Sequence, residues 1–281
     1  MQKSAGEIMT LCKTDAPIIM GVVNVTPDSF SDGGEHYDIH AAIAHSEQIF
    51  EDGALILDIG GESTRPNAEV VSIEEEQKRV LPVIHALKET GAPIISIDTC
   101  NAQTMREAID AGANFINDVS GLTRDKQSVS VVAQSGLPVC IMHMQGTPQT
   151  MQDSPKYDNV LDEVMAFFEE RLNYCEANGV VQNRVILDPG IGFGKTLEHN
   201  LTLIKNLKEF HRFGRPILLG VSRKSFIGAI SGEDNPKERL AGSISTALHG
   251  LEAGVQIFRV HDVKETRQAF DVHHAIKNTK K

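Results

Sequence analysis

The amino-acid sequence predicts a single-domain α/β protein, a (β/α)8 TIM barrel. Eight short, β-branched segments alternate with eight longer segments of helical periodicity along the 281 residues, and both the number of repeats and the length suit such a barrel. The short segments are continuously apolar, which is typical of parallel strands buried on both faces. An open, doubly wound sheet ranks second, because it needs a topological switch point and usually has fewer strands.

Each predicted helix follows its strand after a loop. The strands are expected at 17–25, 54–60, 93–99, 115–120, 138–144, 184–190, 216–222 and 255–263. The helices are expected at 39–53, 72–91, 101–112, 125–136, 158–179, 197–214, 236–254 and 264–278. Several of these helices end in glycine, as helices often do, and Pro93, Pro138 and Pro216 restart the chain in an extended conformation. Residues 1–16 precede the repeat and are expected to pack on the bottom of the barrel formed by residues 17–281.

The composition narrows the class of partner. The chain has 38 acidic and 27 basic residues, a net charge of −11, and it has no tryptophan, which argues against nucleic acid as a ligand. No apolar run approaches the ~18 residues of a membrane span, and no secretion signal is evident at the start. The cysteines Cys12, Cys100, Cys140 and Cys175 are widely spaced. We therefore expect reduced thiols, no zinc site and a cytoplasmic protein.

Polar residues cluster where the predicted strands end, which is the face that carries the active site in such barrels. One buried polar side chain often does no more than cap a loop, but polar residues at all eight strand ends indicate an enzyme or a small-ligand binder. The residues are Asn24, Asp58, Asp98, Asn117, Asp118, His143, Asp188, Ser222, Arg223, Lys224, Arg259, His261 and Asp262.

Two long loops and one glycine-rich segment add detail to this face. The loops TPDSFSDGGEHYD and GESTRPNAEV follow the first two strands and have the composition of a mobile lid. Arg65, with the cationic residues after the last two strands, suggests an anionic group such as phosphate, diphosphate or carboxylate. Asp98, Asn117 and Asp188 could ligate a metal, act as acid or base, or accept N–H donors from a ligand.

The glycine-rich segment DPGIGFGKT (188–196) has neither a dinucleotide-binding nor a P-loop spacing of its glycines. Its glycines more plausibly let the backbone approach a flat ligand beside Phe193.

These motifs together resemble one enzyme family. NVTPDSFSDGG, GGESTRP, SIDT, IND, DPGIGFGKT, GVSRKS and RVHD, in this order at successive strand ends, are similar to the motifs of dihydropteroate synthases of folate biosynthesis. The resemblance runs from about residue 17 to 263, and the first-strand and second-loop motifs are highly specific. Asn67 departs from the glycine that is common in the second loop, which puts only the geometry of that loop in doubt.

The resemblance implies a transferase that joins 6-hydroxymethyl-7,8-dihydropterin diphosphate to 4-aminobenzoate and releases diphosphate and 7,8-dihydropteroate. It also implies a dissociative mechanism, inhibition by sulfonamides, a Mg²⁺ ion held by Asn24, and a homodimer with the last helices as the expected interface.

The resemblance further implies roles for individual residues. The pterin would contact Asp98, Asn117, Asp188, Lys224, Met142, Phe193 and Gly220. The diphosphate would contact Thr64, Arg65, Arg259 and His261. The aminobenzoate would contact Phe30, Thr64, Pro66, Ser222 and Arg223. Asp28 or Asp32 in the lid, together with Lys224 and Arg65, would act in catalysis.

Three other functions stay open. A pterin-binding methyltransferase domain shares the barrel, but it needs neither the lid nor the diphosphate-binding residues Arg65, Arg259 and His261. A non-catalytic pterin-binding paralogue would tolerate loss of the lid or of Lys224, and both are present. A Schiff-base aldolase barrel would need a lysine at a strand end, whereas Lys224 follows its strand and Lys195 lies in a glycine-rich loop.

Overall fold

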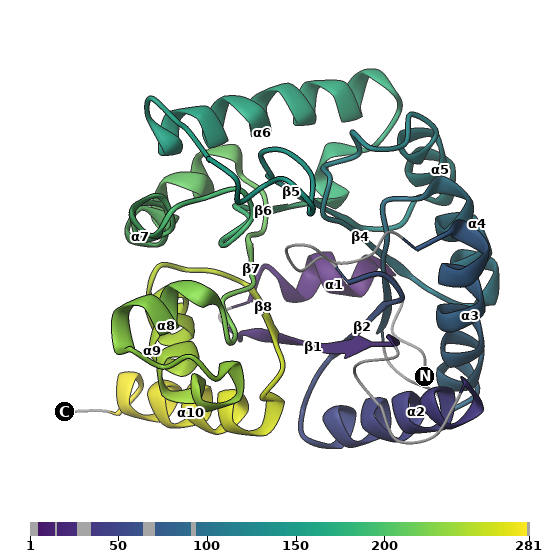
Figure 1. Ribbon diagram of the computed structural model, residues 1–281, viewed down its shortest axis with the longest axis horizontal. Coiled ribbons are helices and arrows are strands. Elements are labelled where there is room, and N and C mark those ends of the chain that lie inside the picture. Colours follow the sequence, from purple (N-terminus) through teal and green to yellow (C-terminus); the bar gives the residue numbers. More distant parts are fainter. Residues whose placement is uncertain (1–4, 15, 27–34, 64–70, 91–93, 280–281) are drawn as a thin grey trace.

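The strands form one parallel sheet that closes on itself. The computed structural model describes residues 5–14, 16–26, 35–63, 71–90 and 94–279. The strand order is β6-β5-β4-β3-β2-β1-β8-β7, and a parallel bridge between Leu187 and Ile217 joins β6 to the segment that leads into β7, so the barrel is nearly closed (Figure 1). The strands are β1 (Ile18–Asn24), β2 (Ile56–Gly60), β3 (Ile94–Asp98), β4 (Phe115–Asp118), β5 (Val139–Met142), β6 (Val185–Asp188), β7 (Leu218–Leu219) and β8 (Ile257–Val260).

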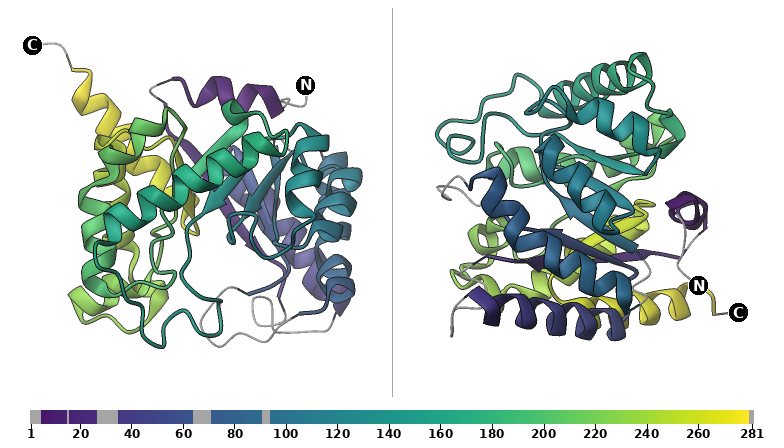
Figure 2. Two further views of the ribbon diagram at one scale, coloured as in Figure 1. Left: turned by 90° about the horizontal axis from the view of Figure 1, so that it is seen from above. Right: turned by 90° about the vertical axis from the view of Figure 1, so that its right-hand side faces the viewer.

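Helices surround this sheet and follow the strands in sequence, which confirms the predicted (β/α)8 barrel (Figure 2). They are α2 (Glu35–Glu51), α3 (Ile73–Glu89), α4 (Ala102–Ala111), α5 (Ser128–Ser135), α6 (Val160–Ala177), α7 (Leu197–Lys205), α8 (Ser225–Ser231), α9 (Leu240–Glu252) and α10 (Val263–Lys277). Short 3₁₀ turns occur at η2 (Gln182–Arg184), η3 (Leu207–Phe213) and η4 (Pro236–Glu238). Within the described residues, no helix has the length and apolar character needed to cross a bilayer.

Three helical segments differ from the prediction. The helix expected at 197–214 is α7 followed by the 3₁₀ turn η3, with a break at Asn206. The helix expected at 236–254 begins only at Leu240, after the 3₁₀ turn η4. Helix α8 was not predicted. Its glycine and β-branched residues are weak helix formers, and burial of Phe226 and Ile227 holds it in place. Tertiary packing therefore overrides local propensity here.

The apolar core has two parts. The larger part lies between the strands and the surrounding helices. The smaller part fills the lower barrel, where Ile8 and Cys12 at the N-terminal helix α1 (Ala5–Leu11) pack with Met20 and Phe115 from the strands. Figure 2 shows α1 lying across one end of the barrel. The polar strand ends are therefore left to the opposite face.

Candidate active site

Four polar side chains meet inside the mouth of the barrel, and we call them the Arg259 cluster: Arg259, Asp58, Asp98 and Asn117. Arg259 Nε donates to Asp58 Oδ2 at 2.6 Å, and its Nη2 donates to Asp98 Oδ2 at 2.8 Å. Asn117 Nδ2 donates to the same Asp58 oxygen at 3.0 Å. The cluster therefore ties together the carboxyl ends of β2, β3, β4 and β8, reaching past β1, which separates β2 from β8.

The charges of the Arg259 cluster do not balance, since two carboxylates share one guanidinium. Burial first, and then the neighbouring Asp58, raise the pKa of Asp98 above its ordinary value, although Arg259 acts in the opposite direction. Burial lowers the pKa of Arg259, but Asp58 and Asp98 outweigh it and raise that pKa overall, so the guanidinium stays charged. Near neutral pH, Asp98 can therefore take up or release a proton when a ligand in the barrel mouth forms hydrogen bonds with it.

A second group faces this mouth from the other side of the barrel. Asp188 at the end of β6 accepts a hydrogen bond from the Gly190 amide at 2.8 Å. Burial raises the pKa of Asp188 to about 6, against the lowering effects of the Gly190 amide and Lys224. The Lys224 ammonium lies 4.1 Å from the centre of the Phe193 ring, a cation–π distance. Burial and then Arg259 lower the pKa of Lys224 to about 8.

The region after β7 and β8 is held by its own contacts. His261 Nδ1 lies 3.0 Å from Ser222 Oγ, and the His261 amide donates to that oxygen at 3.2 Å. Burial and then Arg259 lower the pKa of His261 to about 3, so it is neutral at neutral pH and is not one of the cations expected after the last two strands. Arg223 has a left-handed φ of 60°, and its guanidinium forms an ion pair with Asp262.

The other residues named from the sequence lie at further strand ends or outside the residues that the structure describes. Met142 is buried at the end of β5, in a small apolar cluster that Phe193 borders. Gly220 follows β7, and a Cβ atom added to it would lie 3.9 Å from the Cβ atom of Arg259. Asn24, partly exposed, ends β1. Asp28, Phe30, Asp32, Thr64, Arg65, Pro66 and Asn67 lie outside the described residues, and their roles stay predictions.

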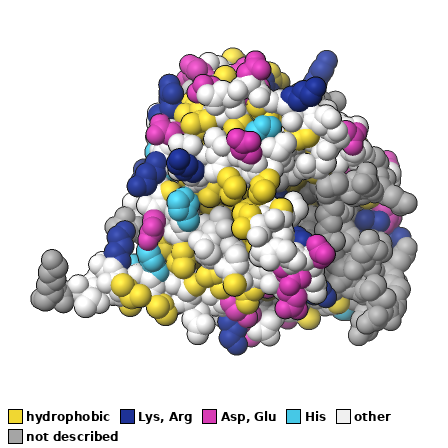
Figure 3. All heavy atoms as spheres, turned by 60° about the vertical axis from the view of Figure 1, so that its left-hand side comes forward, with side chains coloured by type: hydrophobic (Ala, Val, Ile, Leu, Met, Phe, Trp, Pro, Cys, Tyr) yellow, Lys and Arg dark blue, Asp and Glu magenta, His cyan; other side chains and the backbone are white. Residues whose placement is uncertain are grey.

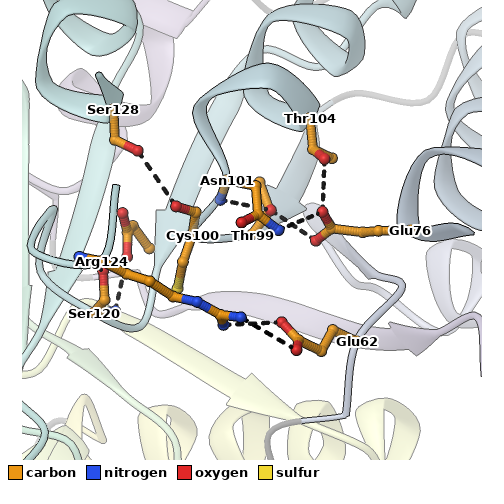
Figure 4. Close-up of polar contacts among 10 residues, drawn as sticks. Glu62, Glu76, Thr99, Cys100, Asn101, Thr104, Ser120, Arg124 and Ser128 are labelled. Atoms are coloured by element: carbon orange, nitrogen blue, oxygen red, sulfur yellow. Dashed lines mark hydrogen bonds and ion pairs between the residues drawn. The ribbon is translucent and has the colours of Figure 1, made fainter. Parts of the chain in front are cut away.

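Sequence reasoning missed the support beneath β3. Glu76 on α3 is 1% exposed, and its carboxylate accepts hydrogen bonds from Thr99 Oγ1 at 2.7 Å, Asn101 Nδ2 at 2.8 Å and Thr104 Oγ1 at 2.6 Å (Figure 4). It borders a pocket of about 350 Å³ that also includes Asp98, and across this pocket Arg124 pairs with Glu62 at 3.0 Å. The available signal was an acidic residue in register with the apolar positions Val80, Val83 and Ile84 of one helix.

Comparison with known proteins identifies the family. The model of the family described as "Pterin binding enzyme" matches residues 20–261. The dihydropteroate synthase of Escherichia coli K12 is 47% identical over 264 residues, which cover 94% of this chain and 93% of that protein. The chain belongs to the dihydropteroate synthase family. It is therefore a transferase, and the resemblance drawn from its motifs is confirmed.

Solved structures of family members share the whole fold. Dihydropteroate synthase of Xanthomonas albilineans with 4-aminobenzoic acid superposes with a TM-score of 0.89 at 44% identity, covering 95% of each chain. The same enzyme in complex with 7,8-dihydropteroate gives a TM-score of 0.86 at 42% identity, again with 95% of each chain covered. Yersinia pestis dihydropteroate synthase with a sulfonamide drug gives 0.88 at 44% identity, covering 94% of this chain and 95% of that one.

The support beneath β3 yields a prediction. Replacing Glu76 with alanine leaves two buried hydroxyl donors and one partly buried amide donor without their acceptor, so Glu76→Ala should lower the free energy of unfolding by about 3 kcal/mol. The neighbouring Glu75 forms a partly exposed pair with Arg79, and Glu75→Ala should cost only about 0.5 kcal/mol. Urea denaturation of the two variants measures the difference. Equal effects would show that the Glu76 network contributes little.

Proposed function

We propose that this enzyme condenses 6-hydroxymethyl-7,8-dihydropterin diphosphate with 4-aminobenzoate to give 7,8-dihydropteroate and diphosphate. The observation that carries the proposal is the pairing of the Arg259 cluster with Asp188, Lys224 and Phe193 around one barrel mouth. Carboxylates, an amide, an ammonium and an aromatic ring are the groups that a flat, nitrogen-rich bicyclic ring requires. The Xanthomonas albilineans relative has been crystallised with 4-aminobenzoic acid and with 7,8-dihydropteroate, which supports 4-aminobenzoate as one substrate and dihydropteroate as the product.

The pterin ring would lie between the two groups. Its N–H donors would meet the carboxylates of Asp98 and Asp188 and the Asn117 side chain, because carboxylates are acceptors when ionised. Lys224 would donate to the ring carbonyl and the N5 edge while Phe193 packs on the ring face. Met142 and Gly220 would complete the walls of this pocket.

The diphosphate would lie nearer the rim. Arg259 uses Nε and Nη2 within its cluster, and a guanidinium has further N–H donors for phosphate oxygens. His261, being neutral, would act as an N–H donor, and Thr64 and Arg65 would complete the site. Of the described residues, no three His, Cys, Asp or Glu side chains form a metal-binding group. A Mg²⁺ ion held by Asn24, phosphate oxygens and waters needs no such group, and its chemistry would be to neutralise the leaving diphosphate.

The proposed reaction is dissociative. The bond between the exocyclic methylene carbon and the diphosphate oxygen breaks first, and both electrons leave with the diphosphate. The resulting methylene cation is conjugated with the pterin ring. The aniline nitrogen of 4-aminobenzoate then forms the new C–N bond and loses one proton to the solvent or the diphosphate. Cations around the leaving group lower the barrier by electrostatic stabilisation, and a closed lid would exclude competing water.

The aminobenzoate would bind between the two long loops and the end of β7. Phe30, Thr64 and Pro66 would line it, with Ser222 below, and Asp28 or Asp32 would steady the cation. For Arg223 to meet the carboxylate of the substrate, its ion pair with Asp262 has to open. Sulfonamides mimic aminobenzoate and would compete at this pocket, in line with the drug complex of the Yersinia pestis relative.

We also infer a homodimer in the cytoplasm. Helices α7 to α10 lie together on the left of Figure 1, and Figure 3 shows apolar side chains among charged ones on the face turned forward from that side. Val272 and Ile276 on α10 are 55% and 72% exposed, which fits an interface formed by the last helices. The four cysteines are buried and free, as in a reducing compartment. Light scattering of the purified protein measures the dimer.

The reaction itself provides the first test. Purified protein, the pterin diphosphate, 4-aminobenzoate and Mg²⁺ should yield diphosphate and dihydropteroate together. Lys224→Ala and Arg259→Ala should each reduce the rate at least about a hundredfold, as the loss of one stabilising donor often does. The exposed Lys205→Ala is the control and should keep the wild-type rate. Tight pterin binding without either product would favour the methyltransferase or the non-catalytic alternative instead.

The pKa shifts predict a bell-shaped pH dependence of ring binding. Asp188 with a pKa of about 6 accepts N–H donors only when ionised, so affinity should fall as the pH drops through 6. Lys224 with a pKa of about 8 donates best as an ammonium, so affinity should also fall as the pH rises through 8. Titration of 6-hydroxymethyl-7,8-dihydropterin between pH 5 and 9 measures the profile. Asp188→Asn should leave an acid limb set by Asp98 alone, whose pKa is raised to about 7, and Lys224→Met should remove the alkaline limb. Wild-type profiles in both variants would contradict these assignments.

A further inference from the structure

The loop after β6, residues 189–195, carries Phe193, and a buried lysine holds it. Lys195 is 3% exposed, and its ammonium donates to the Gly190 and Phe193 carbonyls, both at 3.0 Å. The same nitrogen lies 2.9 Å from His143 Nδ1 and 3.2 Å from the His143 carbonyl oxygen. Lys195 thus connects both ends of the loop to the residue that follows β5.

Two more side chains bind the same loop from the segment between β5 and α6. Gln152 Nε2 donates to the Gly192 carbonyl at 2.7 Å, and the Tyr157 hydroxyl donates to the Gly194 carbonyl at 2.8 Å. Together with Lys195, they satisfy the carbonyls of Gly190, Gly192, Phe193 and Gly194. The Gly192 amide in turn donates to Asn200 Oδ1 at 2.7 Å. Side chains therefore bind four carbonyls and one amide of the backbone around Phe193.

The loop is also packed too tightly to shift freely. Gly190 and Gly194 have φ values of 67° and 60°, a region that other residues rarely adopt. A Cβ atom at Gly190 would lie 1.9 Å from the His143 carbonyl oxygen, and one at Gly194 would lie 2.4 Å from that of Gln145. Glycine at these two positions therefore lets the loop backbone lie close to the backbone at His143 and Gln145, in addition to any approach to a ligand.

Lys195 is suited to structural support and not to covalent chemistry. Within the described residues it forms no ion pair with a carboxylate, and its neighbours are carbonyl oxygens and an imidazole nitrogen. Burial and then the Lys195 charge lower the pKa of His143 to about 3, so the imidazole is a neutral acceptor. The ammonium has four acceptors for its three N–H bonds, which disfavours a Schiff-base role.

We propose that Lys195 is a positioning residue for the pterin site. By fixing the Gly190 and Phe193 carbonyls, it would hold the Phe193 ring 4.1 Å from the Lys224 ammonium and the Gly190 amide on Asp188. Both contacts orient groups that would touch the ring. The inference rests on the proposed function, since it assigns Lys195 to the ring-binding half of that site.

The test compares Lys195→Met with Lys205→Met, which removes the same charge from the exposed face of α7. The probe is 6-hydroxymethyl-7,8-dihydropterin, because it needs neither the diphosphate site nor Mg²⁺. Lys195→Met should bind it at least about tenfold more weakly, and Lys205→Met should match the wild type. In steady state, Lys195→Met should raise KM for the pterin substrate and leave KM for 4-aminobenzoate unchanged.

Milder variants keep the test decisive if Lys195→Met does not fold. Tyr157→Phe and Gln152→Met each remove one contact to the same loop and should weaken binding of the probe several-fold. A folded Lys195→Met with wild-type affinity, or Tyr157→Phe and Gln152→Met both without effect, would overturn the positioning role. Failure of the wild-type protein to bind the probe would instead overturn the proposed function.

Discussion

The guanidinium of Arg259 lies between the carboxylates of Asp58 and Asp98, and the arrangement of the barrel mouth depends on this contact. Without a cation between them, two buried carboxylates at such short range would repel each other, and at least one would bind a proton. Asp58 is completely buried, and Arg259 and Asn117 both donate to its Oδ2. The cluster thereby fixes four strand ends and leaves one edge of Asp98 for a ligand.

The candidate site divides into a rigid interior and a rim. The interior residues come from strand ends and from the loop after β6, whose backbone is held by Lys195, Gln152 and Tyr157. This rigidity suits recognition of a flat ring, because a preorganised site loses little entropy on binding. The proposed dissociative chemistry depends on the rim, where the charge of the leaving diphosphate must be neutralised and water must be excluded. The proposal assigns the first task to Arg259 and His261 with residues of the loop after β2, and the second task to the long loop after β1.

Much of the fold and part of the site could be predicted from sequence. Continuous hydrophobicity and helix periodicity located the strands, and polar residues at their ends located the catalytic face. Pairing across the barrel could not be predicted, since Asp58 and Arg259 are 201 positions apart and meet only when the barrel closes. The burial and the contacts of Lys195 and Glu76 could not be predicted for a related reason. Their acceptors or donors come from other loops, and charged residues are usually exposed.

The most direct test of this account is the affinity of an Asp58→Asn variant for 6-hydroxymethyl-7,8-dihydropterin, measured by calorimetry beside Asp110→Asn, the same change at an exposed site on α4. Asp58 is too deeply buried to touch the ligand, but its charge positions Arg259 and Asn117. The account predicts binding at least about tenfold weaker for folded Asp58→Asn and wild-type binding for Asp110→Asn. Wild-type affinity in a folded Asp58→Asn protein would contradict the dependence of the site on the Arg259 cluster.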